Sequence, residues 1–431
     1  MTSISPELEA AFRIPPDHQA DMELAARYAV EGPRYTSYPT APQFRQDFPL
    51  EHYLSWQGRD GDHKRAPLSL YIHLPFCRDI CYYCACNKIV TREKGVARQY
   101  LDRLQKDIEM QSQLVGEQRP ITQMHWGGGT PTYLDDAEIT ELMHLLASNF
   151  RLLDKNYREY SIEIDPRTVA TSTIALLRGV GFNRISLGIQ DFDPLVQQAV
   201  NRIQPFEQIA PLVDCIRSHD FRSLSFDLIY GLPRQDRHTM KETLRKVNAL
   251  RPDRIACYNY AHLPQRFSSQ RAIDRLTLPQ PREKLLLQQM ISHTLQDAGY
   301  IHIGMDHYVL PQDELATALD EGRLQRNFQG YSLHMADDLL GLGVSAISQI
   351  GDFYLQNERD LQRYYSLIDE ARLPVTRGCR VNAEDRLRRH IIMSLISHLR
   401  LDLVDCNRQF GIDFNTAFRQ QLAALEPMVQ D

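Results

Sequence analysis

Between residues 68 and 260, the hydrophobic and polar positions of the chain follow two alternating patterns. Short apolar runs rich in β-branched and aromatic residues indicate strands, and longer segments with an apolar residue every three or four positions indicate helices. The predicted strands are residues 68–73, 121–126, 160–165, 184–190, 224–230 and 254–260. The helices between them are predicted at residues 94–114, 137–149, 169–178, 206–219 and 240–250.

This order predicts an α/β fold. Strands that alternate with helices form parallel βαβ units with right-handed crossovers. Six such strands fit a partial (β/α)6 barrel better than a closed barrel of eight. After Pro264 the repeat ends. Helices are predicted there at residues 281–298, 360–371 and 386–399, with one further candidate strand at residues 300–305.

We expect three parts in the chain: an N-terminal arm at residues 1–50, the barrel with its extension at 51–370, and a small, mostly helical C-terminal domain at 371–431. The arm contains the run Gly32–Pro42, whose three prolines exclude regular structure. Because this run is rich in Tyr, Thr and Arg rather than Gly and Glu, we predict an ordered arm packed on the body instead of a linker.

The composition is that of an ordinary globular enzyme, with 43% hydrophobic and 24% charged residues. The net charge of -6 gives no general attraction to nucleic acid or to an anionic membrane. No apolar run reaches the roughly 18 residues that a membrane helix needs. The N-terminus is acidic and polar, unlike a signal peptide. We therefore expect a cytoplasmic protein without a membrane or nucleic-acid partner.

Four of the eight cysteines fall within ten residues, directly after the first predicted strand. Cys77, Cys81 and Cys84 follow a C-x3-C-x2-C spacing, and Cys86 comes two residues later. Three thiolates leave one iron of a 4Fe–4S cubane open, whereas a structural zinc site needs four ligands. Zinc and inert thiols are the alternatives, but a zinc site usually has a second cysteine pair, which is missing here. This spacing is the signature of radical S-adenosylmethionine (SAM) enzymes, and the stretch looks like theirs.

Polar or glycine residues also recur where the next predicted strands end, which is where open α/β sheets and barrels place their chemistry. A run of three glycines starting at Gly127 follows the second strand, and its Thr-Pro ending excludes a phosphate-binding P-loop. Any one of these residues is more often structural than functional, but five successive strand ends favour a single site. The others are Glu163 and Asp165, Gln190, Asp227, and Tyr258 with Tyr260 and His262.

Several motifs in matching order go beyond a general radical SAM enzyme. Together they resemble the oxygen-independent coproporphyrinogen III oxidases (dehydrogenases), from about residue 20 to about residue 400. The motifs are Gly32-Pro-Arg-Tyr-Thr-Ser-Tyr-Pro-Thr40, Tyr71-x-His73, Cys84-Ala-Cys-Asn-Lys88, His125-Trp-Gly-Gly-Gly-Thr-Pro-Thr-Tyr133, Val200-Asn-Arg202, Asp227-Leu-Ile-Tyr-Gly-Leu-Pro233, Tyr260-Ala-His-Leu-Pro264, Gly304-Met-Asp-His307 and Asn327-Phe-Gln-Gly-Tyr331.

The resemblance implies an enzyme of heme biosynthesis. Cys77, Cys81 and Cys84 would hold a 4Fe–4S cluster, whose open iron SAM would chelate. One electron would cleave SAM to a 5′-deoxyadenosyl radical, and this radical would take a hydrogen from a propionate of coproporphyrinogen III. Loss of carbon dioxide and an electron would leave a vinyl group. Two propionates treated in this way give protoporphyrinogen IX, with an electron donor and an electron acceptor that the sequence does not identify.

The resemblance also implies specific site residues. The three cluster cysteines and Tyr71 would be catalytic, Cys86 would not be a ligand, and Arg34 is the candidate for binding a substrate carboxylate. A monomer would fit. Two SAM molecules would be bound by Tyr71, Tyr83, Gly128, Gly129, Thr130, Glu163, Gln190, Arg202, Asp227, Ala261 and Ile347.

One departure from this family and two alternative families bear on this interpretation. The family usually continues into a C-terminal winged-helix-like segment, so we expect an incomplete cap over the site. A radical-SAM-like heme chaperone would carry a His-Asn-x-x-Tyr-Trp motif, but this chain has no His-Asn dipeptide. A heme-degrading methyltransferase of the same superfamily would lack the N-terminal arm and the Asn327–Tyr331 motif.

Overall fold

The computed structural model describes residues 35–57, 64–154, 158–327, 329–333 and 338–430, together with Glu23, Leu24, Arg27, Tyr28 and Gly61. The chain divides into two compact units, one made of Met1–Tyr35 with Arg400–Asp431 and the other of Thr36–Leu399. These boundaries differ from those expected at residues 50 and 370, and the three-part division stays a prediction.

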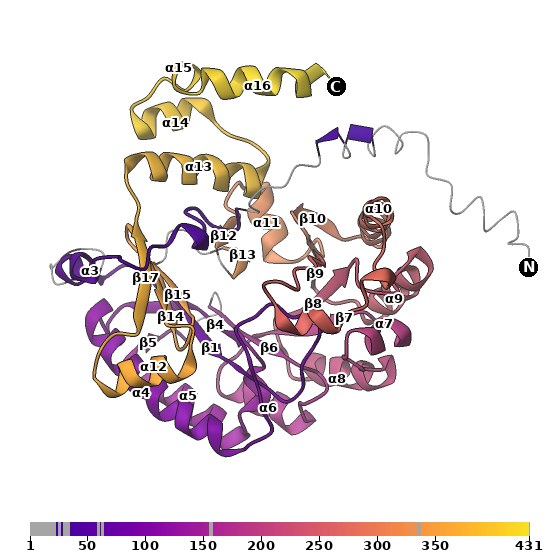
Figure 1. The fold of residues 1–431 in the computed structure, drawn as a ribbon, viewed down its shortest axis with the longest axis horizontal. Coiled ribbons are helices and arrows are strands. Elements are labelled where there is room, and N and C mark those ends of the chain that lie inside the picture. The colour runs from indigo at the N-terminus through magenta and orange to yellow at the C-terminus, as the bar shows by residue number, and fades with distance from the viewer. Residues whose placement is uncertain are drawn as a thin grey trace, which may run out of the picture. The chain divides into compact units, whose positions relative to one another are not determined.

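Six parallel strands form the centre of the larger unit, as the alternation predicts (Figure 1). They are neighbours in chain order, and each pairs in parallel with the next. At least half of the residues in each strand are buried, which suits a sheet whose outer face is covered by helices. The strands are β1 (Leu68–Leu74), β4 (Pro120–Gly128), β6 (Glu159–Ile164), β7 (Arg184–Gln190), β8 (Ser223–Tyr230) and β9 (Arg254–Asn259). The α/β class and the partial barrel are therefore confirmed.

The helices that connect these strands lie along the outside of the sheet (Figure 1). Helix α4 buries the apolar residues Ala97, Leu101, Leu104 and Ile108. Trp126 of β4 meets Phe182 edge to face, with 5.0 Å between the ring centroids. The connecting helices are α4 (Gly95–Val115), α5 (Asp136–Asn149), α6 (Thr171–Gly179), α7 (Pro194–Ala199), α8 (Phe206–Ser218) and α9 (Arg237–Leu250), followed by α10 (Pro281–Asp297).

The parallel sheet contains a seventh strand that the sequence did not predict. β14 (Asp338–Leu342) pairs in parallel with the other edge of β1, where Leu68 meets Asp338. Three antiparallel strands then extend this edge of the sheet: β15 (Ile347–Ile350), β16 (Phe353–Asn357) and β17 (Val375–Arg380). β10 (Ile301–Gly304), which matches the further candidate strand, and β11 (His307–Val309) form the opposite edge, and β12 (Gln325–Asn327) and β13 (Gly330–Ser332) form a separate hairpin.

The described part of the predicted arm, from Thr36, packs against β16 and β17. Tyr354 donates a hydrogen bond from its hydroxyl to the carbonyl of Tyr38, at 3.1 Å. Arg377 donates to the carbonyl of Phe44 at 2.8 Å, and Arg45 forms an isolated β-bridge with Gly378. The candidate substrate residue Arg34 lies outside the described residues.

Helices α12 (Leu361–Asp369) and α13 (Ala383–His398) belong to the larger unit and match predicted helices. The described C-terminal part of the smaller unit consists of α14 (Leu403–Phe410), α15 (Phe414–Ala417) and α16 (Arg419–Gln430). Within it, Phe414 stacks on Phe418 with 4.6 Å between centroids. Among the helices that the structure describes, none combines the length and apolar composition that a bilayer crossing requires.

A buried carboxylate on α4 connects the helices to the chain that follows β14. Asp107 is fully buried and accepts hydrogen bonds at 3.0 Å from the amide of Gly343 and from the hydroxyl of Tyr364. Nearby, the hydroxyl of Tyr100 donates to the carbonyl of His73 at 2.6 Å. Burial raises the pKa of Asp107 to about 6, although the hydrogen bonds from Gly343 and Tyr364 act in the opposite direction.

Replacing Asp107 by Asn should change how stability depends on pH. The folded pKa of about 6 lies above the unfolded value of about 3.9, so Asp107 stabilises the fold most at low pH and loses this effect as the pH rises through about 6. Relative to Asp107→Asn, the wild-type unfolding free energy should fall by on the order of 2–3 kcal/mol across this window. Urea unfolding at a series of pH values measures the difference. Asp102→Asn, an exposed change on the same helix, should keep the wild-type slope. Equal slopes in wild type and Asp107→Asn would contradict the assignment.

Candidate active site

The cysteine loop, residues 77–86, leaves the carboxyl end of β1 and is held by hydrogen bonds to its backbone. The amide of Tyr82 donates to the carbonyl of Val200 at 3.0 Å, and the side chain of Asn201 donates to the carbonyl of Ile80 at 2.7 Å. Ser269 donates to the carbonyl of Cys84 at 3.0 Å. These contacts from two distant loops fix where the thiols point.

The glycine run lies beside the root of this loop. The amide of Gly129 donates to the carbonyl of Leu74 at 2.8 Å, which joins the carboxyl ends of β4 and β1. A Cβ atom at Gly129 would lie 2.6 Å from the carbonyl group of Pro75. Gly128 has φ +109, and a Cβ there would lie 2.5 Å from the His73 ring. Both positions therefore require glycine, because side chains would separate the two strand ends.

The structure brings the three predicted cluster cysteines to one small cavity of about 150 Å³, called here the cluster cavity. Eight of the predicted SAM residues line this cavity as well. They are Tyr83, Gly128, Gly129, Thr130, Glu163, Gln190, Arg202 and Asp227. Cys86 and Arg167 complete part of the wall. Residues from the ends of β4, β6, β7 and β8 therefore converge with the cysteine loop, whereas the fifth predicted strand end, with Tyr258, Tyr260 and His262, does not line this cavity.

Two further cavities adjoin the cluster cavity. The first, of about 440 Å³, is called the Tyr71 cavity and is lined by Tyr71, Ile347 and Gly128, among others. The second, of about 360 Å³, is called the inner cavity and lies among the parallel strands. Glu163 lines all three cavities, so one carboxylate faces each of them. Ala261 lines none of the three. Its carbonyl accepts from Gln270, which also donates to the carbonyl of Tyr83.

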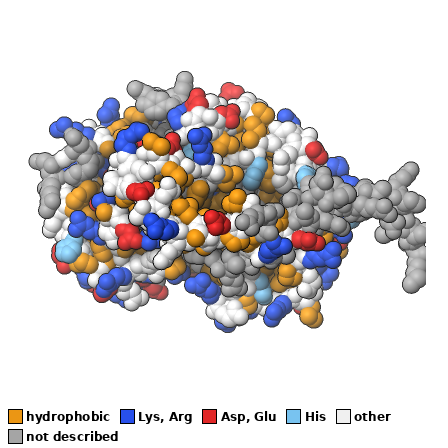
Figure 2. All heavy atoms as spheres, turned by 90° about the horizontal axis from the view of Figure 1, so that it is seen from above, with side chains coloured by type: hydrophobic (Ala, Val, Ile, Leu, Met, Phe, Trp, Pro, Cys, Tyr) orange, Lys and Arg blue, Asp and Glu red, His pale blue; other side chains and the backbone are white. Residues whose placement is uncertain are grey.

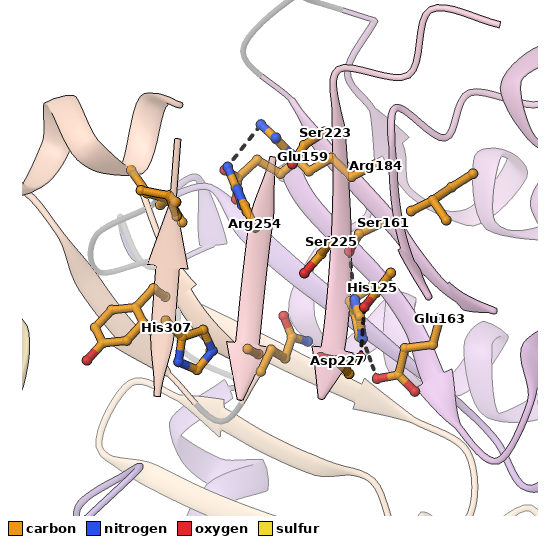
Figure 3. A pocket seen from close by; sticks show the side chains of 18 of the residues that line it. His125, Glu159, Ser161, Glu163, Arg184, Ser223, Ser225, Asp227, Arg254 and His307 are labelled. Atoms are coloured by element: carbon orange, nitrogen blue, oxygen red, sulfur yellow. Dashed lines mark hydrogen bonds and ion pairs between the residues drawn. The ribbon is translucent and has the colours of Figure 1, made fainter. Parts of the chain in front are cut away.

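Figure 3 shows the inner cavity and the polar side chains that line it from neighbouring strands. His125 lies between Ser161 and Glu163, with its two ring nitrogens 2.6 Å from the serine hydroxyl and 3.0 Å from the carboxylate. Glu159, Arg184 and Arg254 lie at the other end of the strands, and Arg184 and Arg254 both pair with Glu314. The charged side chains at this end of the strands are thus paired with one another. The charged side chains near Glu163 lie instead beside the cluster cavity and the Tyr71 cavity.

Comparison with known proteins identifies the family. Residues 71–247 match the model of the radical SAM superfamily. The oxygen-independent coproporphyrinogen III oxidase of Pseudomonas aeruginosa is 48% identical over 414 residues, which cover 95% of this chain and 89% of the relative. That of Escherichia coli is 46% identical over 412 residues, with the same shares. A solved structure of the Escherichia coli coproporphyrinogen III oxidase, a radical SAM enzyme, superposes with a TM-score of 0.88 and covers 92% of this chain and 90% of that chain.

The chain belongs to the oxygen-independent coproporphyrinogen III oxidase family. Family membership supports the oxidase interpretation over the heme chaperone. The radical SAM superfamily implies a 4Fe–4S cluster and SAM as cofactors.

The side chains of the cluster cavity fit such a cluster. Within the described residues, no three His, Cys, Asp or Glu side chains are arranged to hold one metal ion. A cubane accepts each thiolate on a different iron, so its ligands need to line a common cavity without converging on one point. Cys77, Cys81 and Cys84 do line such a cavity, and thiolates are the soft ligands that iron–sulfur clusters require.

The cluster thiols differ in their surroundings. The hydrogen bond between Cys84 and Cys86 is the largest influence on Cys84, and with the nearby Lys88 ammonium it lowers the pKa of Cys84 to about 6, against the effect of burial. Burial raises the pKa of Cys77 to about 11, although the hydroxyl of Thr130 lies 3.6 Å from its sulfur. Cys84 therefore ionises to bind iron more readily than Cys77.

Two carboxylates beside the cysteines are tuned in opposite directions. Burial alone would raise the pKa of Glu163, but hydrogen bonds from His125 and from the amide of Gly128 hold it below its ordinary value. Burial and the negative charge of Glu163 raise the pKa of Asp227 to about 6, despite the hydroxyl of Ser186 at 2.8 Å. Glu163 is thus ionised at neutral pH, while Asp227 protonates in mildly acidic solution.

His73, His125 and Arg167 also line these cavities, although the sequence-based prediction does not include them. The Tyr71 hydroxyl is hydrogen-bonded to Nδ1 of His73 at 3.0 Å. The Tyr71 ring stacks on the His125 ring, with 6.0 Å between centroids. The two histidines stand in motifs that carried the resemblance, so they were visible as candidates. Arg167 lies two residues after Asp165, just beyond the end of β6. An arginine after a strand does not by itself indicate a functional residue.

Replacing Gly129 by Ala should prevent the cysteine loop from reaching its position, because the added methyl group would overlap the carbonyl of Pro75. The expected result is a large loss of cluster loading, from about four irons per chain to well under half of that. Iron analysis after anaerobic reconstitution measures it. Gly179→Ala, where the new Cβ would meet nothing within 4 Å, is the matched control and should load normally. Normal loading of Gly129→Ala would show that this close approach is not required.

Proposed function

We propose that this protein catalyses the oxygen-independent oxidative decarboxylation of two propionate side chains of coproporphyrinogen III to vinyl groups, which gives protoporphyrinogen IX. The observation that carries the proposal is the convergence of three C-x3-C-x2-C thiols with the strand-end residues around Glu163, in a chain of this oxidase family. The three thiols and the strand-end residues support the radical chemistry, and the family supports the substrate class.

When bound, the cluster and SAM supply a 5′-deoxyadenosyl radical that removes hydrogen from a propionate. The protein binds, orients and shields the reactants. Cys77, Cys81 and Cys84 hold the cluster, and Tyr83, Gly129, Thr130 and Arg202 bound the space beside it. The ionised Glu163 can accept hydrogen bonds from ribose hydroxyls or a cationic group of SAM.

The residues implied to bind two SAM molecules fall into two adjacent spaces, which supports a second molecule. Eight of them line the cluster cavity, whereas Tyr71 and Ile347 line the larger Tyr71 cavity. Gly128 and Glu163 belong to both. We assign one SAM to each cavity, with Glu163 between them and Tyr71 beside the second molecule as a catalytic residue. Ala261 would act through the backbone near Tyr83.

Three further parts of the proposal concern partners. The substrate carries four carboxylates, and Arg34 is the proposed partner for one of them. Each propionate that loses hydrogen and carbon dioxide releases one electron, so the reaction requires an acceptor as well as the donor that reduces the cluster. We propose a cytoplasmic monomer without a nucleic-acid or membrane partner. The net charge of -6 and the interspersed positive and negative side chains of the face in Figure 2 agree with this.

An anaerobic assay tests the function. The protein is reconstituted with iron and sulfide, reduced, and given SAM and coproporphyrinogen III. Formation of 5′-deoxyadenosine together with protoporphyrinogen IX is expected. Formation of 5′-deoxyadenosine without decarboxylation would contradict the assignment of coproporphyrinogen III as the substrate. Tight heme binding with neither product would contradict the enzymatic function.

Single substitutions should distinguish the three cluster ligands from the other cysteines. Cys77→Ala, Cys81→Ala and Cys84→Ala should each abolish the visible absorbance and the reduced-state EPR signal of the cluster, because each removes one iron ligand. Cys86→Ala should retain both signals. Cys215→Ala, a thiol on α8 outside the cavities, is the control that should equal wild type. Loss of the cluster in Cys86→Ala would overturn the assignment of three ligands.

A further inference from the structure

Arg167 lies against the middle cysteine of the cluster cavity. Its Nη2 atom is 3.7 Å from the sulfur of Cys81, which is within hydrogen-bond reach of a thiolate. Arg202 reaches the same sulfur from another element, with Nη1 at 3.4 Å. The Arg167 side chain is 18% exposed and Cys81 is 8% exposed, so both groups are largely withdrawn from water.

A single carboxylate fixes Arg167 in this position. Asp165 accepts from Nε of Arg167 at 2.9 Å, from Nη2 at 2.6 Å and from its backbone amide at 3.1 Å. Asp165 also accepts from Nη1 of Arg202 at 3.2 Å. Its two neighbours are guanidinium groups, which stay charged, so the three side chains together carry one positive charge next to Cys81. A forked, two-point contact leaves the guanidinium little freedom to turn away.

The two other cluster cysteines lack such a neighbour. Cys77 has the neutral hydroxyl of Thr130 at 3.6 Å. Lys88 donates to the backbone carbonyl of Cys84 at 3.0 Å, and the Cys84 thiol is hydrogen-bonded to Cys86. In the described residues, only the Cys81 sulfur is hydrogen-bonded by a guanidinium group. Cys84 has a cation nearby as well, the Lys88 ammonium, so what distinguishes Cys81 is the pair of guanidinium groups at its sulfur.

We propose that Arg167 is a positioning residue that donates a hydrogen bond to the Cys81 thiolate and thereby raises the reduction potential of the bound cluster. An added electron increases the negative charge of the cluster, and part of this charge is carried by the thiolate sulfurs. A hydrogen bond and a fixed positive charge at one sulfur stabilise the reduced form, and their effect is large in a cavity that excludes water. The inference deepens the proposed function because it concerns the cluster of the same site.

Arg167, rather than Arg202, is the informative residue. Arg202 also donates to the carbonyl of Gly188 and belongs to the residues implied to bind SAM, so its replacement would change several contacts at once. The hydrogen-bond partners of Arg167 within the described residues are Asp165 and Cys81. Its replacement therefore changes only the contacts with Asp165 and with the Cys81 sulfur.

The test is the midpoint potential of the reconstituted cluster, measured by EPR-monitored redox titration without SAM or substrate. Arg167→Gln removes the charge and should lower the equilibrium constant for reduction about tenfold, which is 59 mV for a one-electron couple. Arg167→Lys keeps the charge but loses the forked contact, so its potential should lie between those of Arg167→Gln and wild type. Arg245→Gln, an exposed arginine paired with Glu242 on α9, should match wild type.

A wild-type potential in both Arg167 variants would overturn the proposal. If Arg167→Gln does not hold a cluster, Arg167→Lys decides: a lowered potential supports the proposal and an unchanged one overturns it. The measurement is independent of the proposed reaction, because it needs no SAM and no porphyrinogen. Failure of wild type to hold any 4Fe–4S cluster would instead contradict the proposed function itself.

Discussion

The site depends on the parallel pairing of neighbouring strands. When strands run in the same direction, their carboxyl ends meet at one edge, and the residues that follow them become neighbours in space whatever their distance in the sequence. Here β1 contributes the cysteine loop, β4 the glycine run, β6 Glu163, β7 Gln190 and β8 Asp227. The crossover helices on the outside of the sheet keep this pairing in place, so the site is a direct product of the fold.

Parallel pairing also determines how the buried charges must be arranged. Charged groups inside a covered sheet need partners, and the inner cavity separates them into two groups. At the amino ends of the strands, Arg184 and Arg254 pair with Glu314, Glu159 and Asp313. At the carboxyl ends, the charges are arranged around Glu163 and Asp165, where they remain close to space that a ligand can fill. The first group stabilises the barrel, and the second leaves charge available for binding.

Much of this could be predicted from the sequence, because each central strand and helix has a strong local pattern. The six strands and the five helices predicted between them match their predicted positions within a few residues, whereas the short α7 was not predicted. β14 was missed for a physical reason: its Leu-Leu-Gly-Leu run has neither alternation nor turn signals, and only pairing with β1 makes it a strand. The convergence of Cys77, Cys81 and Cys84 with the strand ends followed from topology. The contact of Arg167 with Cys81 did not, since it depends on how one loop turns after β6.

The pairing of β14 with β1 has a consequence for how the protein is made. During synthesis, the cysteine loop leaves the ribosome early, but the strand that lies beside its root and the loop that lines the Tyr71 cavity come only near the end of the larger unit. Contacts between such distant segments form slowly, because a long loop of chain must close first. Until then the three thiols lie at an open edge of the sheet. The cysteine loop therefore gains its last neighbours only when the larger unit is nearly complete, and its thiols are open to oxidation in the interval.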